Sequence, residues 1–145
     1  MRILRLFLML VLLYISATAL WGGIVLIVYA HGNPWGMMPL SLLAHSPFHS
    51  WLIPGMILVC ANGLLALCVL WLTLRRASRY GLWCALQGFV LLGWLVVECV
   101  CLRMVMWLHY FYGALALILI LLGFALHSVN APLALASGKS SKQDR

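Results

Sequence analysis

Four long runs of apolar residues make up most of this 145-residue chain, and they restrict its fold more than any other feature. Hydrophobic residues account for 66% of the chain and charged residues for only 8%, whereas soluble domains have about 25% charged residues. This composition cannot supply a polar surface for a soluble, disordered or nucleic-acid-binding protein. It therefore predicts an integral membrane protein that lies almost entirely in the lipid bilayer.

Each apolar run is long enough to cross a bilayer core, which needs about 20 residues of helix. The runs lack the two-residue alternation of barrel strands, and a helix satisfies its own backbone hydrogen bonds in hydrocarbon. We therefore expect an all-α, integral membrane four-helix bundle that forms one membrane domain over residues 1–130. The expected helices cover about residues 6–29, 47–74, 81–104 and 110–127. The polar, basic segment 131–145 is expected to be disordered because it has no apolar face to bury.

The start of the second helix is predicted from Ser46-Pro47. Serine is a preferred N-cap residue, and proline is favoured at the first helical position. The first helix raises a different question, because Ala17-Thr18-Ala19 resembles a signal-peptidase site. Apolar residues continue without a break from Leu20 to Ala30, so we expect an uncleaved signal-anchor helix.

The basic residues predict the orientation of the helices in the membrane. Every lysine and arginine except Arg103 falls before the first helix, between the second and third helices, or after the fourth. The loop over residues 31–50 has no charged residue. The positive-inside rule therefore places both termini in the cytoplasm, and four spans also require both termini on one side. The expected location is the bacterial inner membrane.

Several polar and small residues are expected to face the interior of the bundle. In the third helix one helical stripe is formed by Gln87, Leu91, Trp94, Glu98, Cys101 and Val105. Asn62 and Gln87 are expected to form hydrogen bonds between helices. Small residues allow close packing of helices in lipid, and the candidates are Ala19, Gly23, Gly55, Ala66, Gly113, Ala116 and Gly123.

Glu98 is the most informative single residue, because an acidic side chain inside a span is a functional candidate by default. The functional interpretation is a carboxyl group that carries a proton or binds a ligand in a cavity. The structural interpretation is an acid that is neutral or paired with Arg103 or a nearby histidine. Arg103 lies five residues further on, so a direct pair within one helix is poorly placed.

Histidines cluster at the predicted outer face, where His45, His49 and His109 suit copper or haem iron better than a hard cation. The alternative is that they are polar anchors at the membrane surface, and no zinc or haem-attachment motif accompanies them. The five cysteines all lie in expected spans, so we expect free thiols rather than disulfides.

The basic loop with Arg75, Arg76 and Arg79 is suited to hold anionic lipid headgroups, although it also serves as a topology signal. The chain has no phosphate-binding loop, nucleophile elbow or pair of carboxylates. We therefore expect that it is not an enzyme and that it does not bind nucleic acid.

Two stretches of sequence combine short motifs of proline, glycine and tryptophan. The first reads Ser46-Pro47-Phe48 and continues through Ile53-Pro54-Gly55, and the second runs from Trp94 through Glu98 to Trp107-Leu108. Together they resemble small bacterial membrane proteins of unassigned function. The resemblance covers about residues 43–123 and implies a four-helix fold, but it brings no catalytic residues. Those relatives tend to have Gln-Pro where this chain has His109-Tyr110.

Three functional hypotheses follow from these observations. The leading one is a non-enzymatic membrane protein that acts through helix packing with itself or with a larger membrane partner. The second is a small proton-linked transport element centred on Glu98, with Asn62 and Gln87 lining the path, which would have to oligomerise because transporters usually have more spans. The third is an outer-face haem or copper site built from His45, His49 and His109.

Overall fold

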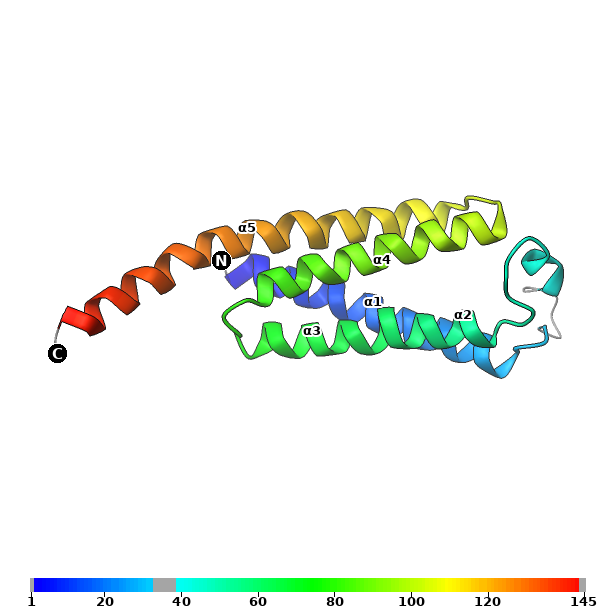
Figure 1. Ribbon diagram of the computed structural model, residues 1–145, viewed down its shortest axis with the longest axis horizontal. Coiled ribbons are helices and arrows are strands. Elements are labelled where there is room, and N and C mark those ends of the chain that lie inside the picture. The colour runs from blue at the N-terminus through cyan, green and yellow to red at the C-terminus, as the bar shows by residue number, and fades with distance from the viewer. Residues whose placement is uncertain (1, 33–38, 144–145) are drawn as a thin grey trace.

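The protein is an all-helical bundle over the residues that the structure, a computed structural model, describes (Figure 1). These are residues 2–32 and 39–143, with side chains described as far as Val129. The long helices are α1 (Arg2–Val28), α4 (Tyr80–Leu102) and α5 (Trp107–Gln143). Between α1 and α4 lie a short 3₁₀ helix, η1 (Leu40–Leu43), and three consecutive helical pieces, α2 (Leu52–Ile57), η2 (Leu58–Leu64) and α3 (Leu65–Leu74).

Among the described residues, four helical segments are long and apolar enough to cross a membrane, as many as the sequence predicted. They cover residues 2–28, 52–74, 80–102 and 107–129. Large apolar side chains such as Trp21 (74% exposed) and Leu121 (67% exposed) project from the bundle. Exposed apolar groups of this size suit a lipid solvent, where they need no partner.

The second span begins at Leu52, so the predicted start at residue 47 is wrong. The Ser46 hydroxyl instead closes a turn: it accepts a hydrogen bond from the Phe48 N–H (3.2 Å) and donates to the Leu43 carbonyl (3.0 Å). Serine satisfies local backbone groups in turns as readily as at helix starts. Pro54 therefore lies in the first turn of α2, where its missing N–H breaks no helical hydrogen bond.

The other helix ends also differ from the predicted boundaries. Helix α4 ends at Leu102 rather than 104, because Arg103 adopts a left-handed conformation with φ of 50°. Helix α5 begins at Trp107 rather than 110 and continues to Gln143 beyond the expected end at 127. The backbone of 131–143 is therefore helical where disorder was expected. The first turn of a helix is the costly one to form, and residues added to an existing helix avoid this cost. The segment can therefore be helical even though it has no apolar face to bury.

The second span contains an irregular stretch in its middle. Segment η2 is a π-helix, and its last turn is closed by the Leu65 N–H donating to the Cys60 carbonyl five residues earlier. Such wide turns are rare in proteins, and many of those that occur lie at functional sites. Asn62, which is fully buried, lies in this segment.

The helices pack as two close pairs, with small residues at the contacts. A Cβ atom built on Gly55 would lie 2.9 Å from the Gly23 carbonyl oxygen, so α2 approaches α1 backbone to backbone. Likewise, a Cβ atom on Gly123 would lie 2.6 Å from the Gly81 carbonyl oxygen, which joins α5 to α4. The predicted contact at Gly113 is wrong, because no atom of another described helix lies within 4 Å of a Cβ atom placed there.

An apolar core fills the half of the bundle next to the N-terminus and the α3–α4 connection (Figure 1). All four spans contribute to it; examples of its fully buried residues are Leu8, Leu12, Val69, Cys84 and Leu119. The opposite half, near the α4–α5 connection, has a smaller apolar cluster of Leu26, Leu43 and Trp51 and a cavity. It contains the polar side chains of the candidate site.

Candidate functional site

A cavity of about 140 Å³ lies between the helices near the α4–α5 connection. Side chains from α1, the second span, α4, α5 and the α4–α5 connection line it, and most of them are apolar. The polar side chains in its wall are Thr18, Asn62, Glu98, His109 and Tyr112. The tertiary structure thus brings the membrane acid predicted from the sequence together with one of the three histidines.

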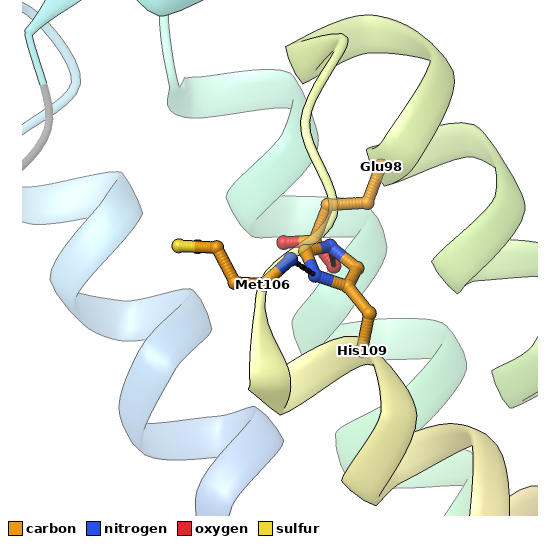
Figure 2. A network of polar contacts seen from close by, with 3 residues as sticks. All are labelled: Glu98, Met106 and His109. Carbon is orange, nitrogen blue, oxygen red and sulfur yellow. Dashed lines mark hydrogen bonds and ion pairs between the residues drawn. The ribbon is translucent and has the colours of Figure 1, made fainter.

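Glu98 projects from α4 toward the first turn of α5, as Figure 2 shows. Its Oε2 atom lies 3.9 Å from His109 Nε2, and its side chain is 36% exposed. The stripe predicted on the third helix is confirmed as far as this residue: Gln87 and Leu91 are buried, while Trp94 and Glu98 are partly buried and line the cavity. Cys101 is also partly buried, but the prediction for Val105 is wrong, because it lies beyond the end of α4 and is 57% exposed.

Arg103 does not pair with Glu98 in the part of the chain that the structure describes. Its side chain is exposed, and its left-handed backbone conformation ends α4. Of the two partners that the sequence suggested for Glu98, the structure therefore selects the histidine.

His109 is held in place by the backbone at the start of α5. Its Nδ1 atom accepts a hydrogen bond of 3.0 Å from the N–H of Met106, the residue before the helix (Figure 2). The His109 N–H donates in return to the Met106 carbonyl oxygen (3.0 Å). A side chain at the third helical position that accepts from the N-cap N–H forms one half of a capping box. Helix initiation thus fixes the imidazole ring.

This hydrogen bond also determines which ring nitrogen of neutral His109 carries the proton. A backbone N–H can only donate, so Nδ1 must accept, and the ring proton lies on Nε2. His109 is 8% exposed, and its Nε2 has no hydrogen-bond partner among the described residues. An unpaired N–H donor therefore faces the Glu98 carboxyl group.

Asn62 and Gln87 form the interhelical hydrogen bond that the sequence predicted. The Gln87 Nε2 atom donates to Asn62 Oδ1 and to the Ala61 carbonyl oxygen, both at 3.4 Å. Both side chains are fully buried. Asn62 Nδ2 and Gln87 Oε1 have no partner among the described residues. Of the two, only Asn62 lines the cavity.

A second, smaller cavity of about 30 Å³ lies on another side of Glu98. Glu98 and Trp94 line both cavities, so they separate the two spaces. The wall of the smaller cavity includes Trp51, whose indole N–H is buried without a partner among the described residues. No sequence signal connects Trp51 with Glu98.

Metal binding by the three histidines is not supported by their placement. His45 and His49 are exposed in the connection before α2. Within the described ranges, no three His, Cys, Asp or Glu side chains are close enough together to hold a metal ion. His109 also presents an N–H from Nε2 instead of the lone pair that a metal needs. The histidines are therefore not gathered into one haem or copper site.

The basic loop lies at the end of the bundle away from Glu98. Arg75, Arg76 and Arg79 are exposed there, and the Arg75 guanidinium carbon lies 4.8 Å from the centre of the Trp71 ring. Exposed arginines beside a tryptophan are typical of the interface between membrane and water. The five cysteines are free thiols, as predicted.

No protein-family model, curated protein or solved structure matches this chain. The resemblance to small bacterial four-helix proteins therefore remains an expectation. Any function has to be inferred from the residues of the site.

Proposed function

We propose that this chain is a non-enzymatic, multi-pass protein of the bacterial inner membrane that works as a small proton-linked transport element. The observation that carries the proposal is the placement of Glu98 opposite the Nε2–H of His109 in the wall of a cavity. Ionisable side chains inside spans mark proton or substrate pathways in many membrane proteins. Here Glu98 is the proton carrier and His109 its positioning partner.

The chemistry of the pair supports proton exchange at Glu98. A carboxylate can accept the Nε2–H of His109, and after protonation it becomes a donor that can turn into the cavity. The titratable side chains that line the two cavities are Glu98, His109, Tyr112 and Cys101. Because Nδ1 of His109 is occupied by the Met106 N–H, a second proton on the ring would break the cap of α5. The Glu98 carboxyl group is thus the site that binds and releases the proton.

The next polar groups of the proposed path, after Glu98, are the buried side-chain amides of Asn62 and Gln87. Asn62 lines the cavity, and Gln87 is bonded to it from the opposite helix. Four spans are few for a transporter, since most are built from repeated units of several helices. We propose that copies of the chain associate to complete the path through the membrane.

The proposed orientation has both termini and the α3–α4 connection in the cytoplasm and the Glu98 cavity near the outer surface. The N-terminus and that connection lie at one end of the bundle, and the α4–α5 connection lies at the other (Figure 1). The arginines in the first turns of α1 and those after α3 therefore gather at a single end, as the positive-inside rule requires. In this orientation Arg75, Arg76 and Arg79 face anionic lipid headgroups.

Reporter fusions test the orientation. Fusions after residue 78 and after residue 145 are expected to give cytoplasmic signals, and a fusion after residue 36 a periplasmic signal. A periplasmic C-terminus would contradict the proposed topology.

Substitution of Glu98 with glutamine tests the proton-linked function. In liposomes given a step of pH, the wild-type protein is expected to equilibrate internal pH faster than empty liposomes. Glu98→Gln keeps the shape of the side chain and removes its titratable proton, so the rate should fall to that of empty liposomes. An internal pH indicator gives the rate.

The matched control is Asp144→Asn, which removes the other acid of the chain. It should behave as wild type. Equal rates for Glu98→Gln and wild type, with both proteins folded in the liposomes, would remove Glu98 from the mechanism.

A second candidate function is packing against a larger membrane partner. The observation that favours it is the extension of α5 past the rest of the bundle as far as Gln143 (Figure 1). Another protein can pack against a helix that protrudes from a bundle. This function does not involve the cavity, so it would survive Glu98→Gln, whereas proton-linked transport would not.

A further inference from the structure

The unpaired polar atoms around Glu98 are mainly donors. The wall of the larger cavity contains Asn62 and His109, whose Nδ2 and Nε2 nitrogens carry N–H groups without a partner among the described residues. Trp51 adds a third unpaired N–H on the smaller cavity. Leaving a buried donor unsatisfied destabilises a protein by about 1–3 kcal/mol, so native structures rarely leave several together. The cavity is thus suited to a ligand that brings acceptor atoms.

The size and walls of the larger cavity suit one ring. Its volume of about 140 Å³ is close to that of an engineered cavity, about 150 Å³, that holds benzene. Aliphatic side chains such as Leu58, Leu91 and Leu95 form much of the wall, and Trp94 and Tyr112 add aromatic surfaces. Apolar walls with a few polar groups are typical of sites for small organic molecules.

The polar groups of the wall favour a neutral ligand over an ion. A bare cation would be attracted by the Glu98 carboxylate but would also meet the N–H donors of Asn62 and His109, which repel it. An anion would meet the Glu98 carboxylate, which lies 3.9 Å from His109 Nε2. A neutral molecule with carbonyl oxygens meets neither obstacle, and its oxygens accept from both donors.

We infer that the larger cavity binds a neutral, lipid-soluble, one-ring carbonyl compound of the quinone kind. Its carbonyl oxygens accept hydrogen bonds from His109 Nε2 and Asn62 Nδ2, and its ring packs against Trp94 and Tyr112. The ligand reaches the cavity from the membrane, because every wall of the site belongs to a membrane span or to the short α4–α5 connection. This inference deepens the proposed function by naming a ligand for the same site, but binding itself requires no proton flux.

Paired ligands test the role of the carbonyl groups. The probes are duroquinone and durene, which share a planar six-membered ring with four methyl groups. Duroquinone has two ring carbonyl groups where durene has two aromatic C–H groups. Purified full-length protein in nanodiscs is expected to bind one duroquinone per chain saturably. Durene should bind at least about tenfold more weakly, which corresponds to about 1.4 kcal/mol. Equal binding of the two, or unsaturable uptake of duroquinone, would overturn the inference.

A cavity-filling substitution tests the location. Leu58→Trp places extra volume in the cavity, so duroquinone affinity should fall at least about tenfold, the equivalent of about 1.4 kcal/mol. The matched control is Leu121→Trp, at an exposed apolar position on the outside of α5, which should keep wild-type affinity. Equal loss in both variants, or loss in neither, would place duroquinone elsewhere and overturn the assignment.

Infrared spectroscopy gives a measurement that does not depend on the fold of a variant. The carbonyl stretch of isotope-labelled duroquinone should move to lower frequency in the wild-type protein than in empty nanodiscs, because hydrogen bonds weaken the C=O bond. An unshifted band at saturation would overturn the inference. Duroquinone binding without Glu98-dependent proton flux would retain the inference and refute the proposed function, and flux without binding would do the reverse.

Discussion

Replacing Gly123 with leucine is expected to separate α5 from α4 and to lower the stability of the bundle by about 3 kcal/mol, near the upper end of the range for overpacking. A Cβ atom at this position would lie 2.6 Å from the Gly81 carbonyl oxygen and 2.7 Å from the Ala85 nitrogen. Both neighbours are backbone atoms, which cannot rotate away as a side chain can. The two helices would therefore have to move apart along their contact.

Denaturant titration of the protein in detergent micelles measures this loss. The matched control is Gly113→Leu, in the same helix, where the described residues leave open space around the added Cβ. It should change the unfolding free energy by less than about 0.5 kcal/mol, as surface substitutions usually do. Equal effects at the two positions would contradict the close approach of α4 and α5.

Replacing Gln87 with leucine is expected to lower stability by about 1 kcal/mol, close to the average for hydrogen bonds between membrane helices. The change removes the donor that reaches Asn62 Oδ1 and the Ala61 carbonyl oxygen, and it leaves Asn62 buried without its partner. Asn62→Leu should have an equal or smaller effect, because Gln87 loses one acceptor and keeps the Ala61 carbonyl oxygen.

The double variant separates a paired interaction from two independent losses. When both amides are replaced by leucine, no buried polar group is left unpaired, so the change in unfolding free energy should not exceed that of the more harmful single variant. The same denaturant titration measures all three proteins. Strictly additive effects would show that the two amides do not interact.

The inward stripe on the third span illustrates what the sequence predicts well. Gln87, Leu91, Trp94 and Glu98 recur at helical spacing, and the structure places all four on the side of α4 that faces the bundle or its cavities. Periodicity predicts this because the geometry of one helix alone decides which side chains share a face. The pairing of Asn62 with Gln87 was predicted for a related reason, since buried amides in lipid have few alternatives to each other.

The sequence was less informative about the role of a polar side chain that several backbone groups can bind. Ser46 was expected to cap the second span and instead closes a turn, because several nearby backbone groups can bond to its hydroxyl. His109 was considered as a metal ligand and is a helix cap whose free N–H faces Glu98. Nothing in the local sequence distinguishes these roles, since each depends on where the chain goes next.

The sequence by itself determined the helical class and the four membrane-length segments of this protein. Apolar runs without charge have to satisfy their backbone hydrogen bonds locally, and a helix does so within one segment. Only the tertiary structure decided that Glu98 meets His109 and not Arg103, and that Asn62, Trp51 and His109 bring unpaired donors to cavities around it. These contacts depend on the rotation and axial position of separate helices. The close glycine contacts of the two helix pairs are among the features that define those positions.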